Sequence, residues 1–246
     1  MKLAAICCTY KRPGQLTTAI ECFLRQDYPA ELRELIVLDD AHQYESQQGE
    51  GWRLVSVPIR FRTLGEKRNA SAALVSPDVD AYCVWDDDDV YLPWHMTAAA
   101  AALADADYTI PTVIYSDKRT RLERKANQYL FHGAWAFRRQ VFEQVGGYPF
   151  MQSGQDQGLL RRFKLARLRR ADPIQFDPRP SYVYRWYTAH VQHISAMGRD
   201  GYARLGQSPA HRIESLTPQW DVDWLALFET AQRQERESER EPATEV

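Results

Sequence analysis

The chain has 246 residues and a mass of 28.5 kDa, enough for one large domain with a substantial core. Its net charge is -2 and its pI is about 6.3, which argues against a general nucleic-acid-binding protein. The apolar N-terminal stretch is too short for a signal peptide, and the alanine- and leucine-rich run at residues 98–104 is too short to cross a bilayer. We therefore expect a cytoplasmic protein, and the sequence leaves peripheral contact with a membrane open.

The four cysteines, Cys7, Cys8, Cys22 and Cys83, lie in apolar surroundings and show no Cys-x-x-Cys spacing. This pattern predicts reduced cysteines packed in a core, and it argues against a cysteine metal site or a disulfide framework.

The N-terminal region predicts a βαβ unit. Residues 3–8 form a continuous apolar run, typical of a buried parallel strand, and Pro13 suits the first turn of a following helix. The apolar side of that helix comprises Leu16, Ile20, Phe23 and Leu24. Residues 35–38 form a second buried strand, so the unit implies a parallel sheet.

The next segments extend this pattern. Residues 41–51 are polar and predict a loop, and residues 52–57 predict a third strand. Residues 64–75 predict a helix of small side chains that carries Lys67 and Arg68 toward the same edge of the sheet.

Acids follow two of the predicted strands. Residues 82–85 are an apolar run that ends at four consecutive aspartates, residues 86–89, and the second strand ends at Asp39 and Asp40. Ligands bind open α/β sheets at the carboxyl ends of the strands, and neighbouring carboxylates repel unless a cation offsets their charge. A solvated acidic turn is the alternative for the four aspartates, and structural capping could explain either group but explains both poorly. The pattern therefore predicts a site for Mg²⁺ or Mn²⁺.

The second half of the chain begins with a predicted helix at residues 93–104 and a strand at residues 108–115. Residues 116–128 are polar and charged, and a short helix at residues 139–145 ends at Gly146 and the glycine after it.

A basic helix then opens near Ser153. Asp156 lies in its first turn, where an acid is usually an N-cap or a partner of the helix dipole. The basic residues of this region are Arg161, Arg162, Lys164, Arg167, Arg169 and Arg170. Such a run is usually a solvated face, and the alternatives are a site for an anionic acceptor or for an anionic membrane surface.

The C-terminal part contains a predicted strand at residues 181–187, followed by His190 and His193. Either histidine could be a structural residue or a metal ligand. Residues 232–246 are charged and poor in apolar side chains, and we expect them to lack regular structure.

In this order, the elements resemble those of family 2 glycosyltransferases with a GT-A fold. The matching segments are residues 8–13, Asp39 with Asp40, residues 65–70, residues 86–89 with their DxD motif, residues 133–149 and Gln155 with Asp156. The resemblance covers about residues 2–195 and implies a single α/β domain, with a mostly parallel central sheet flanked by helices. It further implies a nucleotide-sugar-binding half at residues 1–115, an acceptor-binding and catalytic half at residues 116–220, and a C-terminal helix and charged tail at residues 221–246.

The resemblance also implies site residues and an Mn²⁺ or Mg²⁺ cofactor. The donor contacts would be Thr9, Tyr10 and Arg12 along the nucleotide, Asp39 or Asp40 at the base, Arg68 at the base or diphosphate, and Asp86 and Asp87 at the ribose. Asp88 would be the direct metal ligand, a role that Asp86 could share. His193 would be the second ligand, with His190 as the alternative, and Asp89 receives no role.

The implied reaction is a metal-dependent, inverting transfer of a sugar from a nucleotide-diphosphate sugar, of UDP type, to an acceptor hydroxyl. Asp156 would be the general base. Gln155 departs from the acid usual in the family. No Gln-x-x-Arg-Trp motif follows Asp156, which argues against a processive polysaccharide synthase.

Two other functions are considered. A sugar nucleotidyltransferase would need a glycine-rich phosphate loop after the first strand, where only Gly14 is present. A nucleotide-sugar-binding protein without turnover fits poorly with the intact acids. The acceptor stays undetermined: a glycan, a lipid-linked saccharide or other phosphorylated lipid, and nucleic acid are all open.

Overall fold

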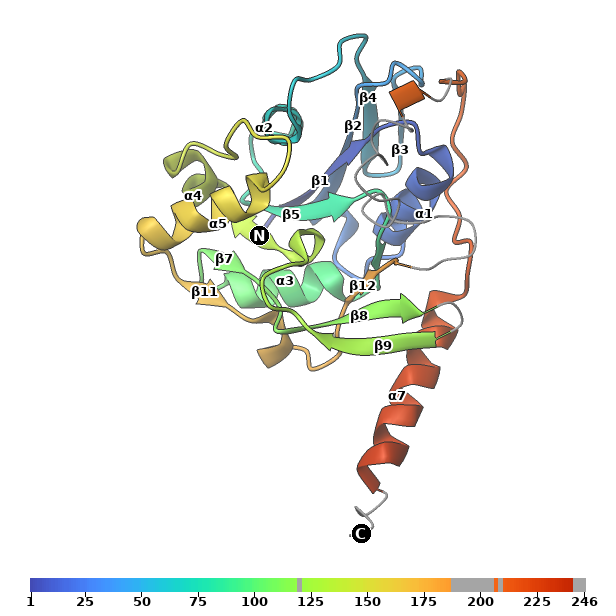
Figure 1. Ribbon diagram of the computed structural model, residues 1–246, viewed down its shortest axis with the longest axis vertical. Helices are drawn as coiled ribbons and strands as arrows, with labels where there is room; N and C mark the ends of the chain where they lie inside the picture. The colour runs from blue at the N-terminus through green and yellow to red at the C-terminus, as the bar shows by residue number, and fades with distance from the viewer. Residues whose placement is uncertain (119–120, 187–205, 208–209, 241–246) are drawn as a thin grey trace.

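The computed structural model describes residues 1–118, 121–186, 206–207 and 210–240, which form two β-sheets with helices around them (Figure 1). The strands of the larger sheet are β1 (Leu3–Thr9), β2 (Arg33–Asp39), β3 (Gln47–Gly49), β4 (Trp52–Ser56), β5 (Ala81–Asp86), β7 (Tyr108–Thr109), β10 (Ala136–Arg138) and β11 (Arg170–Ala171). The smaller sheet contains β6 (Val90–Tyr91), β8 (Val113–Lys118), β9 (Arg121–Ala126) and β12 (Tyr182–Tyr184). The α-helices are α1 (Pro13–Leu24), α2 (Leu64–Ala73), α3 (His95–Leu103), α4 (Arg139–Gln144), α5 (Gln155–Leu165) and α7 (Trp224–Arg240), and the short 3₁₀ helices are η1 (Ala30–Leu32), η2 (His132–Ala134) and η3 (Pro173–Gln175).

The described strands of the larger sheet follow the order β11-β7-β10-β5-β1-β2-β4-β3, and those of the smaller sheet follow β6-β12-β8-β9. The central strands β5, β1, β2 and β4 are parallel to one another, whereas β3 and β10 are antiparallel to their neighbours. The predicted α/β domain with a mostly parallel central sheet is therefore confirmed.

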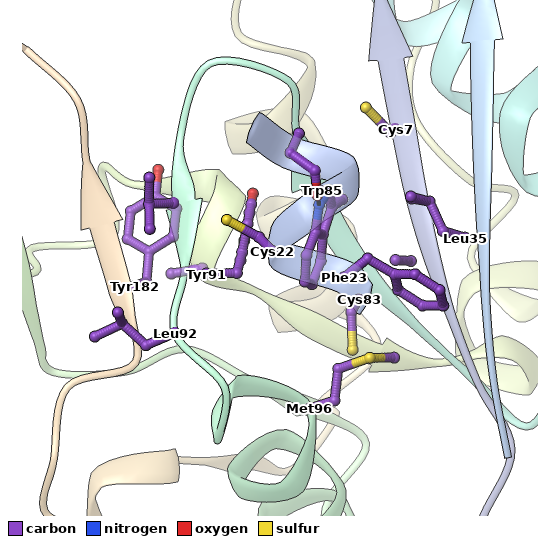
Figure 2. Packing of buried hydrophobic residues seen from close by; sticks show 14 of the residues in the cluster. Cys7, Cys22, Phe23, Leu35, Cys83, Trp85, Tyr91, Leu92, Met96 and Tyr182 are labelled. Carbon is purple, nitrogen blue, oxygen red and sulfur yellow. Dashed lines mark hydrogen bonds between the residues drawn. The ribbon is translucent and has the colours of Figure 1, made fainter. Parts of the chain in front are cut away.

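Both faces of the larger sheet are buried, which explains the continuous apolar runs of its central strands. Side chains alternate along β5, so Cys83 and Trp85 face the layer that contains α1 and α3, while Tyr82 and Val84 face α2, α4 and α5. The indole of Trp85 stacks on the ring of Tyr91, with centroids 3.7 Å apart (Figure 2). Its Nε1 donates a hydrogen bond to a backbone carbonyl of α1 at 3.0 Å. This packing anchors the C-terminal end of β5, where the aspartates begin.

The structure differs from the expectations at three places. The predicted loop at residues 41–51 contains β3, which is antiparallel to β4. The single strand expected at residues 108–115 is divided into β7 and β8, with Pro111 between them. Strand β8 then pairs with β9 as a hairpin, in the polar and charged stretch for which the sequence predicted no strand. Helix α7 extends to Arg240, beyond the point where regular structure was expected to end.

Hydrogen bonds between polar side chains stabilise the extension of α7. Gln232 donates a hydrogen bond to the hydroxyl of Tyr115 at 2.5 Å, and that hydroxyl donates to Glu235 at 3.1 Å. These contacts hold α7 against the smaller sheet, although this part of its sequence is too polar to be held there by apolar burial alone. Among the described residues, no helix combines the length and apolar composition needed to cross a bilayer.

Asp89 joins the two sheets. It follows β5, and its carboxylate accepts hydrogen bonds from the hydroxyl of Tyr182 on β12 and from the backbone N–H of Arg185 at 3.0 Å. Its side chain is enclosed, since only 1% of the residue is exposed. Arg185 in turn forms an ion pair with Asp221, just before α7, at 2.5 Å. The fourth aspartate of the run therefore has a structural role.

We predict that Asp89→Ala lowers the free energy of unfolding by about 2–4 kcal/mol, because two buried donors lose their acceptor. Chemical denaturation measures this change. The matched control is Asp105→Ala, which removes an exposed acid and should change stability by less than about 0.5 kcal/mol. Equal losses in the two variants would contradict the structural role of Asp89.

Candidate active site at the carboxyl edge of the sheet

Three parallel strands end at one edge of the larger sheet. In the register of β1 with its two neighbours, Thr9 lies opposite Asp39, and Cys8 lies opposite Asp86. The two acidic strand ends are therefore brought to the same edge, on either side of β1, as the sequence predicted. This is the edge at which open α/β sheets bind ligands.

A cavity of about 140 Å³ opens at this edge. The predicted donor-contacting residues that line it are Thr9, Tyr10, Arg12, Asp40, Arg68 and Asp86. The predicted metal ligand Asp88 also lines it, whereas Asp39 and Asp87 are enclosed, with 0% and 1% exposure.

The two acids at the end of β2 have different surroundings. Asp39 accepts hydrogen bonds from two backbone N–H groups of the following loop and from the hydroxyl of Ser56, at 2.8–3.0 Å. Asp40 pairs with Lys67 at 2.5 Å and with Arg60 at 2.7 Å. Asp39 therefore holds the loop after β2, and Asp40 is the acid of this pair that lines the cavity.

Arg68 of α2 lines the cavity beside Asp86, with Nη2 2.7 Å from the Asp86 carboxylate. The residue is 6% exposed, and among the described residues its Nε and Nη1 have no hydrogen-bond acceptor. Burial opposes the charge of Arg68, but the Asp86 carboxylate, together with Tyr148 and Cys8, outweighs burial and raises the pKa of Arg68 well above its ordinary value. A buried, charged guanidinium with unsatisfied donors at a cavity suits an anionic ligand.

Arg12 bridges the next two acids of the run. Its Nη2 lies 2.5 Å from Oδ1 of Asp87, and its Nη1 lies 2.6 Å from Oδ2 of Asp88. Burial raises the pKa of Asp87 to about 7, and the guanidinium of Arg12 opposes this rise. Because Arg12 already contacts Asp88, a divalent cation bound there would have to share this carboxylate with Arg12 or displace it.

A glycine allows η2 to approach the acids. A Cβ added to Gly133 would lie 3.0 Å from Oδ2 of Asp86 and 2.8 Å from the hydroxyl of Tyr182, so a side chain would not fit without movement. The residue before it, His132, has its Nε2 3.1 Å from the hydroxyl of Tyr148. Burial lowers the pKa of His132 well below its ordinary value, and nearby Arg68 adds to this effect, so the imidazole is neutral.

Asp156 lies in the first turn of α5, after Gly154, whose φ of 75° places it in the left-handed region. It is partly exposed, and no side chain or backbone group of the described residues forms a hydrogen bond or ion pair with its carboxylate. Burial raises the pKa of Tyr148, Arg68 opposes the rise, and Asp86 and Asp156 both add to it. Asp156 and Asp86 therefore both lie near Tyr148.

The predicted histidine ligand His193 and its alternative His190 lie outside the described residues. Within the described part of the chain, no three His, Cys, Asp or Glu side chains are grouped to hold a metal ion. Asp86 and Asp88 do line one cavity, and Mg²⁺ often binds one or two protein carboxylates together with phosphate and water oxygens. These two carboxylates fit a cation that binds together with a diphosphate.

The structure adds residues to which the sequence gave no role. Lys67 is buried and donates to the backbone carbonyl of Thr9 as well as to Asp40. The sequence had already indicated that Lys67, beside Arg68 at the start of a helix, lies near this edge of the sheet. Arg60 lies over the ring of Tyr10, 3.5 Å from the centroid, and no local pattern identifies this long-range contact.

We predict that Arg12→Met lowers the free energy of unfolding by about 2–3 kcal/mol, because Asp87 stays buried without its cation. Adding Asp87→Asn should recover most of this loss, and denaturation of the single and double variants measures the coupling. Arg60→Met is the matched control: it removes a cation from the same cavity, but its partly exposed pair with Asp40 should contribute less than about 1 kcal/mol. Equal losses for Arg12→Met and Arg60→Met would contradict the anchoring of Arg12 by Asp87.

Residues 4–168 match the family model described as Glycosyl transferase family 2. A search of curated proteins found no match. Among solved structures, the chain is similar to S. aureus TarS 1-349 in complex with UDP-GlcNAc, with a TM-score of 0.61 and 15% identity over 80% of this chain and 61% of that chain. It is also similar to the mannosyltransferase PcManGT from Pyrobaculum calidifontis in complex with GDP-Man and Mn²⁺, with a TM-score of 0.59 and 17% identity over 85% of this chain and 65% of that chain.

The chain thus spans less than two thirds of the length of these structures, and identities this low show a shared fold. The family match shows more than the fold. It covers more than half of the 246 residues and includes the edge of the sheet that carries the cavity. This chain belongs to glycosyl transferase family 2.

Proposed function

We propose that the protein transfers a sugar from a nucleotide-diphosphate sugar, of UDP type, to an acceptor hydroxyl, with a divalent cation and with inversion of the anomeric carbon. The observation that carries this proposal is the buried Arg68, charged and with unsatisfied donors, beside Asp86 and Asp88 in one cavity. This cavity combines a site for phosphate oxygens with carboxylates for a cation, as a donor diphosphate requires.

The donor is proposed to lie along the ends of β1 and β2. Thr9, Tyr10 and Arg12 would follow the nucleotide, and Asp40 would contact the base, since it lines the cavity while Asp39 is enclosed. The solved structures support a nucleotide sugar, because one contains UDP-GlcNAc and the other contains GDP-Man. They differ in nucleotide, so the choice of UDP rests on the resemblance of the motifs.

The cation is proposed to be Mn²⁺ or Mg²⁺, held by Asp88, with Asp86 beside it and His193 as a second ligand. The PcManGT complex, which contains Mn²⁺, supports this assignment. When bound, the cation supplies positive charge that stabilises the departing nucleoside diphosphate. Arg68 would bind the same phosphate oxygens and keep the diphosphate in place.

In the proposed reaction, the acceptor oxygen forms a bond to the anomeric carbon from the side opposite the diphosphate. The bond from that carbon to the diphosphate oxygen breaks, and the proton of the acceptor hydroxyl passes to the carboxylate of Asp156. The absence of a partner for Asp156 among the described residues supports this role, since a carboxylate in an ion pair would be a weaker base.

The first test concerns the metal and the nucleotide. We expect UDP to bind more tightly with Mn²⁺ than with EDTA, and more tightly than GDP does, when affinities are measured by calorimetry. Asp88→Ala should weaken binding of UDP in the presence of Mn²⁺ by about 10- to 100-fold and have little effect in EDTA. Asp105→Ala is the control and should behave as the unaltered protein. Unchanged Mn²⁺-dependent affinity in Asp88→Ala would remove Asp88 from the metal site.

The second test concerns the base. Asp156→Asn keeps the shape of the side chain and should lower the rate of metal-dependent donor hydrolysis, in which water replaces the acceptor, by about 10²- to 10⁴-fold. The affinity for UDP with Mn²⁺ should stay the same, because Asp156 does not line the donor cavity. Release of nucleoside diphosphate gives the rate. Hydrolysis at the original rate would place the base elsewhere.

A further inference from the structure

The outer face of α5 is basic and carries an exposed leucine. Gln157, Arg161, Lys164 and Leu165 recur at spacings of three and four residues, so they share one face of the helix, and all four are exposed. Leu165 is 74% exposed, although α5 buries its other apolar residues against the larger sheet. Helix α5 lies on the side of the molecule away from α1 and α7 (Figure 1).

A second exposed apolar segment adjoins this face. The side chain of Gln157 donates to the backbone carbonyl of Tyr129 at 2.8 Å, and the ring of Tyr129 lies within 5.0 Å of the Lys164 ammonium. Arg170 donates to the Tyr129 hydroxyl at 2.6 Å. The next residue, Leu130, is 67% exposed. We call the six residues Tyr129, Leu130, Arg161, Lys164, Leu165 and Arg170 the basic-apolar surface.

The cations of this surface are not neutralised by the protein. In the described ranges, none of Arg161, Lys164 and Arg170 forms an ion pair with an acid, and the only acid within α5 is Asp156 at its opposite end. Arg162 has a separate role, since it donates to three backbone carbonyls after α4. The whole chain has a net charge of -2, so attraction to an anion would have to come from this local concentration of charge.

We infer that the basic-apolar surface docks the protein on an anionic lipid bilayer. Lysine and arginine side chains are attracted to anionic headgroups, and exposed leucine side chains gain by entering the boundary between headgroups and acyl chains. Tyrosine suits the same boundary, because its ring is apolar and its hydroxyl is polar. A soluble polyanion would use the cations and would leave Leu130 and Leu165 in water, so the paired exposure of these leucines favours the bilayer.

The basic-apolar surface is connected along the chain to two segments of the candidate active site. Helix α5 begins with the turn that carries Asp156, and Leu130 is followed by η2, whose Gly133 approaches Asp86. Docking would therefore place the lipid on the side of the molecule that carries η2 and α5. The inference does not depend on the role of Asp156 as a base.

Co-sedimentation with vesicles tests the inference on the full chain. We expect binding to vesicles of phosphatidylcholine with phosphatidylglycerol, little binding to phosphatidylcholine alone, and weakening as salt is raised. Each cation near an anionic bilayer contributes about fivefold to affinity, so the double variant Arg161→Gln with Lys164→Gln should reduce vesicle binding by more than about tenfold. Arg121→Gln with Arg124→Gln is the matched control, because it removes the same charge from exposed positions on β9.

A second pair of variants separates the bilayer from a soluble polyanion. Leu130→Ser with Leu165→Ser should weaken vesicle binding several-fold and leave retention on heparin unchanged. All variants alter exposed side chains, and circular dichroism checks their folding. Three outcomes would overturn the inference: no preference for anionic vesicles, equal loss in the β9 control, or full vesicle binding by the serine variant.

Discussion

The arrangement of this protein depends on the neutralisation of buried and partly buried carboxylates at the ends of parallel strands. Asp86 ends β5 and Asp40 follows β2, the two strands that flank β1, and their charges would repel if left alone. Each is paired with a cation from α2, Asp40 with Lys67 and Asp86 with Arg68. The same ion pairs therefore hold α2 at the edge of the sheet and form one wall of the cavity.

The four consecutive aspartates have different surroundings because the chain turns after β5. Asp86 and Asp88 line the cavity, while Asp87 and Asp89 are enclosed. Asp87 anchors Arg12, and Asp89 accepts hydrogen bonds from β12 and the residue after it, so half of the acidic run supports the structure around the other half.

The elements that were predicted correctly are those whose local sequence pattern is clear. The apolar runs of β1, β2 and β5 and the glycine-terminated helix α4 appear close to where they were expected, since local pattern and tertiary burial agree there. Strand β9 was missed, because its pairing with β8, the burial of Leu122 and its contact with α7 stabilise a segment that is otherwise charged. The last turns of α7 were missed for a related reason, since their contact with Tyr115 spans more than a hundred residues of sequence.

The amino-acid sequence by itself determined the fold class, the edge of the sheet where the acids gather and the family to which the chain belongs, because these follow from strand composition and from motifs that are contiguous. The tertiary structure decided which acid of each group lines the cavity, which cation pairs with it, and that Asp89 joins two sheets. Those outcomes depend on contacts between residues that are distant in the chain, such as Arg12 with Asp88 and Tyr182 with Asp89. No local pattern encodes such pairings, because their geometry exists only once the strands are in register.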